Sequence, residues 1–223
     1  MSSLYVVATP IGNLEDITLR ALRTLKEVDV IYAEDTRVIS KLLAKYEIRK
    51  PLHRLDASKE ESRVEEIVER LQAGESIAYV SDAGTPGISD PGAKLVAGVR
   101  AAGGSVVAIP GASSLTAALS ISGVAADNFL FLGFLPHKKG RQTALKHIAA
   151  QEVPVVLFES PHRILKLLTE IETFAPGKQV TIARELTKMF EEVITGAPIE
   201  VRERLEKNKT ARGEFVVIVD RRG

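Results

Sequence analysis

The sequence has no cysteine among its 223 residues. This absence excludes disulfides, thiol catalysis and cysteine-ligated zinc or iron–sulfur centres. The four histidines show no metal-ligand spacing either, so we expect no metal. They are His53, His137, His147 and His162.

Long hydrophobic runs are also absent. None approaches the ~20 residues that a helix needs to span a bilayer, and residues 1–5 lack the basic and apolar regions of a signal peptide. Apolar residues make up 45% and charged residues 26% of the chain, which excludes wholesale disorder, collagen-like repeats and coiled coil. We therefore expect a cytoplasmic globular protein with no membrane partner.

Two signatures of nucleotide binding are missing. The sequence contains neither the G-x-x-x-x-G-K-[ST] phosphate loop nor the G-x-G-x-x-G dinucleotide fingerprint. The segment 111–114, Gly-Ala-Ser-Ser, is not a G-x-S-x-G nucleophile elbow. The missing phosphate loop disfavours an NTPase.

Charge is balanced overall but unevenly distributed. The formal net charge of +1 indicates no nucleic-acid partner by itself. Residues 1–128 hold 14 Lys and Arg against 17 Asp and Glu, whereas residues 129–223 hold 16 against 12. Two interpretations stay open: the second half presents a basic face, or these charges are ordinary solvated surface.

Short apolar runs alternate with amphipathic helical patterns along the chain, which is typical of α/β folds. A loop over 122–128 interrupts the alternation, so we expect two α/β domains, residues 1–124 and 125–223. The expected strands are 4–8, 28–32, 76–80 and 105–109, then 129–135, 153–158, 180–185, 191–195 and 214–220. The expected helices are 18–26, 38–46, 62–73, 92–102 and 112–121, then 140–150, 164–174 and 199–206.

Three loops that follow strands of the first domain are rich in glycine and proline: 9–13, 81–92 and 110–114. In open α/β sheets ligands bind outside the carboxyl ends of the strands. Glycine permits close backbone approach to a ligand and proline keeps a loop rigid. The pattern predicts a preformed cleft at this edge.

The chemistry of these loops disfavours a phosphate ligand. They carry Asp82 and Asp90 but neither Lys nor Arg, and Pro86 and Pro91 remove two amide donors. Carboxylates and backbone groups suit ribose hydroxyls, amines and cationic centres. The alternative is a tight structural connection in which Asp90 caps the following helix.

Basic residues follow strand ends in the second domain. Together they form a candidate surface for a phosphate backbone; separately, each suits solvated surface or an ion pair. The predicted RNA-binding residues are Lys138, Lys139, Arg141, Arg163 and Arg184.

Five segments, in this order, carry a resemblance to a known family. They are 9–14 (Thr-Pro-Ile-Gly-Asn-Leu), 33–37 (Ala-Glu-Asp-Thr-Arg), 81–92, 158–163 (Phe-Glu-Ser-Pro-His-Arg) and 183–188 (Ala-Arg-Glu-Leu-Thr-Lys). The chain closely resembles the tetrapyrrole (precorrin/diphthine) methylase superfamily, in its branch that methylates ribosomal RNA. Asp-Ala-Gly-Thr-Pro followed by Asp-Pro-Gly within 81–92 is highly specific to that branch.

The resemblance implies two α/β domains with S-adenosylmethionine in the cleft between them, and a homodimer. It also implies methylation of a cytidine ribose 2′-hydroxyl in the decoding region of small-subunit rRNA. The loops agree with this cofactor, which has a cationic sulfonium and no phosphate. By matching loop to loop, the resemblance assigns cofactor binding to Pro10, Asp82, Ala83, Gly84, Thr85, Pro86, Ser113 and Ser114, and to Phe158, Ala183, Gly213 and Glu214.

Catalysis by such an enzyme requires the methyl group and the oxygen to meet in line, and a base or a charge stabiliser assists because a 2′-hydroxyl is a weak acid. The candidates are Glu159, Glu185 and Lys188, just beyond strand ends of the second domain. An equally open alternative pairs Glu159 with Arg163 and Glu185 with Arg184 as structural ion pairs.

Two rival functions stay open. One is methylation of a small corrinoid, which the basic second half and the 81–92 loop argue against. The other is a non-catalytic module that binds S-adenosylmethionine or a nucleotide.

Overall fold

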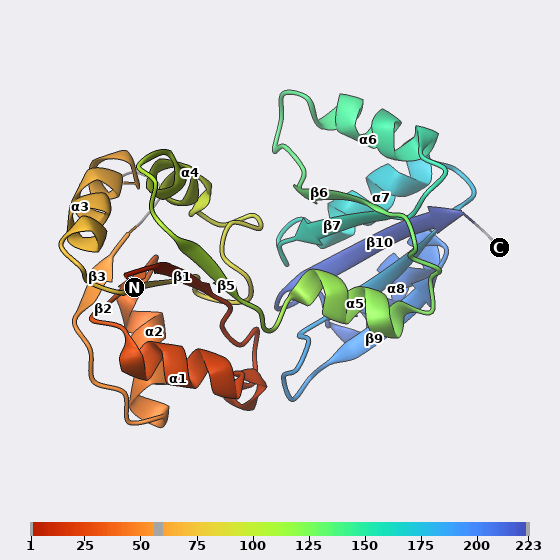
Figure 1. Cartoon of the computed structure of the whole chain (residues 1–223). Coiled ribbons are helices and arrows are strands. Elements are labelled where there is room, and N and C mark those ends of the chain that lie inside the picture. The colour runs from red at the N-terminus through yellow and green to blue at the C-terminus, as the bar shows by residue number, and fades with distance from the viewer. Residues whose placement is uncertain (1, 56–59, 222–223) are drawn as a thin grey trace. The chain divides into compact units, whose positions relative to one another are not determined.

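The computed structural model describes residues 2–55 and 60–221. Contacts divide the chain into two units, Met1–Ser113 and Ser114–Gly223. Each unit carries a five-stranded sheet covered by helices (Figure 1). This confirms the expected class of two α/β units. Among the helices of the described residues, none is long and apolar enough to cross a bilayer.

The first unit is a parallel sheet with helices on both faces. Its strand order is β3-β2-β4-β1-β5 and every pairing is parallel. Figure 1 shows α1 and α2 on one side of this sheet and α3 and α4 on the other. The elements are β1 (Leu4–Val7), η1 (Leu14–Asp16), α1 (Leu19–Glu27), β2 (Val30–Ala33), α2 (Thr36–Lys45), β3 (Leu52–Arg54), α3 (Glu60–Gln72), β4 (Ile77–Val80), α4 (Ala93–Ala101) and β5 (Val106–Ile109).

Both faces of the first sheet are buried, and β2 shows why the sequence reads as continuous apolar runs. Val30 and Tyr32 belong to the core shared with α3 and α4, whereas Ile31 and Ala33 belong to the core shared with α1 and α2. Successive strand residues point to opposite faces. A strand covered on both faces therefore needs apolar residues at every position.

The second unit is a mixed sheet ordered β6-β7-β10-β8-β9. Only β6 and β7 are parallel; the other three pairings are antiparallel. Leu145 of α6, Leu167 of α7 and Leu205 of α8 share one core with this sheet. The elements are α5 (Ser114–Ser122), β6 (Leu130–Phe134), α6 (Arg141–Ala150), β7 (Val155–Glu159), α7 (Ile164–Phe174), β8 (Lys178–Arg184), β9 (Glu192–Gly196), α8 (Pro198–Asn208) and β10 (Phe215–Arg221).

The division between the units falls before α5 rather than after it. Interruption of the helix–strand pattern placed the expected boundary at 124/125. In the structure α5 contacts β8, β9 and β10, so its contacts lie within the second unit, and the division falls between Ser113 and Ser114. Local pattern cannot distinguish the two divisions, because an apolar helix reads the same whichever sheet it covers.

Candidate active site

The carboxyl ends of the parallel strands in the first unit gather the glycine-rich loops at one edge. Thr9, two residues after β1, and Gly84, in the loop after β4, exchange two backbone hydrogen bonds of 2.9 and 3.0 Å. The Thr9 hydroxyl donates to the carbonyl of Ser81 at 3.1 Å, and the Ser81 hydroxyl donates to the carbonyl of Gly84 at 2.9 Å. The loops after β1 and β4 are therefore joined by backbone contacts.

The loop after β5 reaches the same place. The Thr85 hydroxyl donates to the carbonyl of Ala112 at 3.3 Å. Gly84 lies between these loops at φ +82°, and a Cβ there would stand 3.3 Å from Cγ2 of Ile11. A larger residue would be strained in this backbone conformation and crowded by its neighbour. The sequence prediction that these loops meet at one edge is correct.

Carboxylates concentrate at this edge. Oδ1 of Asp82 accepts a hydrogen bond of 2.9 Å from the backbone N–H of Asp35, at the start of α2. Burial, with the nearby charges of Glu34 and Asp82, raises the pKa of Asp90 from 3.8 to about 6. The charges of Glu34 and Asp82 thus act on Asp90, and this concentration of acids favours a cationic ligand over a phosphate.

Asp35 has a local structural role. Its side chain accepts a hydrogen bond from the N–H of Arg37 and so caps α2. Its carboxylate also lies 2.6 Å from the Arg37 guanidinium. The hydrogen bonds from Arg37 lower the pKa of Asp35 to about 2. The side chain therefore stays ionised at the helix N-terminus, where a negative charge is favourable.

A cavity of about 310 Å³ lies beside the loop after β4. Of the residues predicted to bind cofactor, Pro86 lines it; Pro10 is buried, Ala83 is exposed, and Ser113 and Ser114 are half-buried. The cavity is lined by Val6, Tyr79, Pro86, Gly87, Gly92, Ala93 and Val96.

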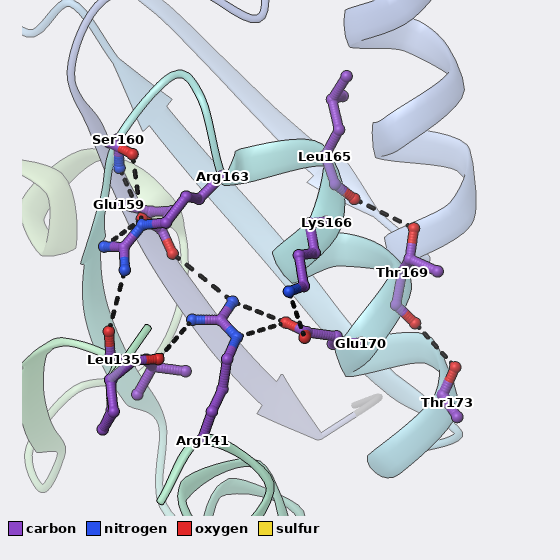
Figure 2. Close-up of polar contacts among 11 residues, drawn as sticks. Leu135, Arg141, Glu159, Ser160, Arg163, Leu165, Lys166, Thr169, Glu170 and Thr173 are labelled. Carbon is purple, nitrogen blue, oxygen red and sulfur yellow. Dashed lines mark hydrogen bonds and ion pairs between the residues drawn. The ribbon is translucent and has the colours of Figure 1, made fainter. Parts of the chain in front are cut away.

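In the second unit, Glu159 at the end of β7 is buried in an ion-pair cluster. Its Oε1 lies 2.7 Å from the Arg163 guanidinium and accepts the N–H of Ser160 at 2.8 Å. Figure 2 shows Arg141 approaching the same carboxylate; that distance is 3.9 Å. The Glu159 side chain is 0% exposed. The structural ion pair between Glu159 and Arg163, one of the two sequence alternatives, is therefore present.

Arg141 does not lie on the surface as the prediction of RNA binding requires. Its side chain is 5% exposed, lies 2.6 Å from a carboxylate oxygen of Glu170 on α7, and donates to the carbonyl of Pro136 at 3.1 Å (Figure 2). A guanidinium held in this way has no free donor face for a phosphate. Arg141 instead anchors the segment that leads into α6.

The remaining predicted basic residues divide into two groups. Arg163 is mostly buried beside Glu159, and Arg184 is 8% exposed, with its guanidinium 3.3 Å from Glu192. Lys138 and Lys139 are exposed, and within the described parts of the chain they have no ion-pair partner. Only these two lysines have the accessibility that a phosphate contact requires.

The loop after β8 brings together two of the predicted catalytic residues. Nζ of Lys188 lies 3.0 Å from Oε1 of Glu185 and 2.9 Å from Oε2 of Glu214. Burial opposes the charge on Glu185, but the hydrogen bonds from Lys188 and from the Glu214 N–H outweigh it and lower the pKa of Glu185. Burial likewise opposes the charge on Lys188, and bonds to Glu214 and Glu185 outweigh it and raise the pKa of Lys188. Both groups are ionised at neutral pH.

This loop is held in an unusual backbone conformation. Glu185 and Thr187 lie at φ +51° and +64°, a region that costs free energy for residues other than glycine. Gly213, at φ +84°, faces Glu185 so closely that a Cβ would overlap the carboxylate. The positions of Glu185 and Lys188 are thus set by backbone geometry together with hydrogen bonds.

Phe158 and Ala183 lie on the same side of the second sheet. Each is the register partner of Val216 on β10, from β7 and β8 respectively. The Phe158 ring makes edge contacts with Phe131 and Phe134, with centroids 5.0 and 5.7 Å apart. The sequence pattern by itself does not identify Phe131 or Phe134 as partners of Phe158. Their spacing of three residues in an expected strand indicated opposite faces, and a register shift between Phe131 and Gly133 overrides that spacing.

Within the described residues there is no group of three or more His, Asp or Glu side chains placed to hold a metal ion.

Comparison with known proteins shows one family. Residues 3–200 match the Tetrapyrrole (Corrin/Porphyrin) Methylases. The chain is 46% identical over 221 residues to ribosomal RNA small subunit methyltransferase I of Synechocystis sp., covering 98% of this chain and 79% of that protein. It is 45% identical over 219 residues to the protein of the same name from Thermotoga maritima, covering 98% of each.

Solved structures share the fold at low identity. A diphthine synthase superposes with a TM-score of 0.77 at 17% identity, covering 98% of this chain and 90% of that one. Uroporphyrin-III C-methyltransferase from Thermus thermophilus, complexed with S-adenyl homocysteine, superposes with a TM-score of 0.65 at 20% identity, covering 98% and 97%.

Proposed function

The chain belongs to the tetrapyrrole methylase family, within the group of ribosomal RNA small subunit methyltransferases I, and we propose that it transfers a methyl group from S-adenosylmethionine to small-subunit rRNA. The acceptor is the ribose 2′-oxygen of a cytidine in the decoding region. The relative of that name from Thermotoga maritima is matched over 98% of both chains, which supports the same activity here. The proposal includes a homodimer acting in the cytoplasm.

The observation that carries the proposal is the chemistry of the edge formed by the loops after β1, β4 and β5. The charges of Glu34 and Asp82 both act on Asp90 there, and no Lys or Arg belongs to the three loops. A sulfonium and an amine suit such a site, whereas the phosphates of a nucleotide do not. The missing side chain of Gly84 lets the loop after β4 pack closely against Ile11 and pair with Thr9, which keeps the edge in a fixed conformation. These residues fit S-adenosylmethionine.

S-adenosylmethionine supplies, when bound, a methyl group on a positively charged sulfur. The first unit would contribute binding: Asp82 and its loop neighbours up to Pro86 would line the ligand, and the hydrogen bonds from Thr9 and Thr85 keep these loops in place before it arrives. A preformed site avoids the entropy of ordering loops at the moment of binding. Much of the catalytic effect then comes from holding the methyl group and the oxygen in line.

We assign to Lys188 the role of contacting the ribose 2′-oxygen that attacks the methyl group. Its raised pKa keeps the ammonium protonated, so it serves as a charge stabiliser for the developing alkoxide rather than as a base. Glu185, ionised beside it, is the acceptor for the ribose proton. Glu159 has no accessible oxygen, so it acts by positioning the end of β7 rather than on the ribose.

The test is transfer of labelled methyl from S-adenosylmethionine to small ribosomal subunits that lack their native ribose methylations, followed by nuclease mapping. Label on one cytidine 2′-oxygen, lost in Lys188→Met, is the expected result. Cofactor binding by calorimetry without label in RNA, or label in an added corrinoid instead, would overturn the proposal. Sedimentation of the purified protein tests the homodimer separately.

A further inference from the structure

A second cluster of positive charge lies in the first unit, on α2 and the segment that leads into β3. Residues 36–54 contain six Lys and Arg and one acid, Glu47. The other residues of 1–113 contain eight Lys and Arg against fifteen Asp and Glu. An otherwise acidic unit thus contains one stretch of 19 residues in which cations outnumber acids by six to one. The charge balance of residues 1–128 as a whole does not reveal this stretch.

The cations lie opposite the buried face of α2. Ile39, Leu42 and Leu43 are the buried residues of this helix. Lys41 and Lys45 are four residues apart and therefore share a face, and both are exposed. Their separation along the helix axis is about 6 Å, from the rise per residue. The row of charge thus faces solvent.

The basic row continues past the helix end. Arg49 is exposed and Lys50 half-buried in the segment that follows. Glu47 turns the chain at φ +55°, and the N–H of buried Ile48 donates to the carbonyl of Leu43 at 2.9 Å. The segment is therefore anchored to α2, and its cations extend the row from the helix.

A hollow of about 710 Å³ lies beside this row. Two of the cations, Arg49 and Lys50, line it, so the surface is concave as well as basic. The lining residues are Ser40, Leu43, Ala44, Glu47, Ile48, Arg49, Lys50 and Leu52.

Stability of the fold does not explain these charges. Like charges four residues apart destabilise a helix. Lys41, Lys45, Arg49 and Lys50 have no ion-pair partner in the described ranges 2–55 and 60–221. A cation near the helix C-terminus interacts favourably with the helix dipole and so stabilises the helix, but this explains only Lys45.

We propose that Lys41, Lys45, Arg49 and Lys50, here called the α2 basic surface, bind the phosphate backbone of the RNA substrate. The inference rests on the proposed function, which supplies the polyanion. Several unpaired cations in one row gain affinity for a polyanion by releasing its counterions. Tyr46, the aromatic ring within the row, is half-buried and its hydroxyl donates to the carbonyl of Leu14 at 2.7 Å. The surface therefore reads backbone charge rather than base identity.

The test compares two triple variants. Lys41→Gln/Lys45→Gln/Arg49→Gln removes three charges from the α2 basic surface. Arg23→Gln/Lys26→Gln/Arg100→Gln removes three exposed charges elsewhere in the same unit. Binding of transcribed small-subunit rRNA is measured by fluorescence anisotropy from 50 to 300 mM salt, alongside calorimetry with S-adenosylmethionine and urea unfolding.

We expect the first variant to lose about tenfold or more in RNA affinity at low salt. We also expect its slope of log Kd against log salt to fall by about 2, since each phosphate contact contributes about 0.7 to 0.9. Cofactor affinity stays unchanged, and resistance to urea stays equal or rises because like-charge repulsion is relieved. The control variant keeps the wild-type slope.

The outcomes separate this inference from the proposed function. Equal slopes in wild type and both variants, with methyl transfer intact, overturn the α2 basic surface alone. Equal losses in both variants overturn it too, because net charge then suffices. If wild type binds RNA without transferring methyl, the proposed function fails, while a slope loss confined to the first variant still supports the surface. If the first variant keeps its affinity for RNA but loses affinity for an acidic protein, the choice of RNA as the partner is overturned.

Discussion

The carboxylate of Glu159 lies 2.7 Å from the guanidinium of Arg163, and both groups are largely removed from solvent at the end of β7. Arg163 and Arg141, the two arginines beside Glu159, also hold the start of the loop after β6. Arg163 donates to the carbonyl of Leu135 and Arg141 to that of Pro136, each at 3.1 Å. This loop carries Lys138 and Lys139. A buried ion pair thus positions two exposed cations.

Glu159→Gln is expected to reduce stability more than activity. Removing one charge of a buried pair leaves the other uncompensated and costs about 3 kcal/mol. Urea unfolding of the variant, beside Glu172→Gln on the exposed face of α7 as control, measures the loss. Unchanged unfolding together with a hundredfold fall in methyl transfer would instead make Glu159 a catalytic residue.

Asp82→Asn is expected to weaken S-adenosylmethionine binding about tenfold. The amide oxygen still accepts the Asp35 N–H, so the loop is retained while the charge is lost. A hydrogen bond involving a charged group contributes about 1.5–3 kcal/mol, which corresponds to about ten- to hundredfold in affinity. Calorimetry on this variant and on exposed Asp16→Asn checks the effect. Equal affinities would remove Asp82 from the site.

The raised pKa of Asp90 makes stability depend on pH. Between its ordinary value of 3.8 and about 6, the folded chain holds a proton that the unfolded chain has released. Stability from this group therefore falls as pH rises through that window and stays low above it. Asp90→Asn removes the titratable carboxyl group. The stability of the variant relative to wild type should therefore increase from pH 4 to pH 7 in urea titrations. A constant difference between the variant and wild type at all pH values would contradict this account.

Gly213→Ala is expected to impair methyl transfer, because the new Cβ displaces the carboxylate of Glu185 and with it Lys188. Gly177→Ala is a matched control: Gly177 lies at φ +83° in the same unit with open space around it. Both substitutions carry the backbone cost of about 1–2 kcal/mol. Only Gly213→Ala should lose activity, by about tenfold or more. Equal activities in the two variants would remove the loop after β8 from catalysis.

Lys138→Gln/Lys139→Gln is expected to weaken RNA binding and leave cofactor binding unchanged. If each of the two exposed lysines contacts one phosphate, their loss lowers the slope of log Kd against log salt by about 1.4 to 1.8. Anisotropy titrations against salt detect the change, with Lys207→Gln/Lys209→Gln as an equally exposed control. A loss of cofactor affinity in the lysine variant would show that the loop before α6 serves the cofactor instead.

Strand β3 shows where pattern reading stops. Its three residues, Leu52–Arg54, are too few and too polar to read as a strand, yet they pair in parallel with β2 at the edge of the sheet. Pairing with a neighbour that is already ordered decides such a segment. Helix α5 shows the same limit, since its apolar residues suit either sheet and its contacts with β8, β9 and β10 assign it to the second.

The arginines show the limit for function. In the sequence, Arg141 and Lys138 are neighbouring cations in one basic run. In the structure, Glu170 lies 2.6 Å from Arg141, so this guanidinium is buried, while Lys138 stays exposed. The partner is 29 residues away along the chain. A sequence shows that a charge exists, and only the fold shows whether another charge neutralises it.

The sequence by itself determined the α/β class, the edge at which the loops meet, and the family, because alternation, glycine and proline placement and motif order are local properties. The tertiary structure decided which carboxylates lie close enough to act on the pKa of Asp90, which arginines are buried, and that Gly213 lies against Glu185. These depend on distances between residues far apart in the chain. Electrostatic and steric energies follow those distances, and one-dimensional order does not contain them.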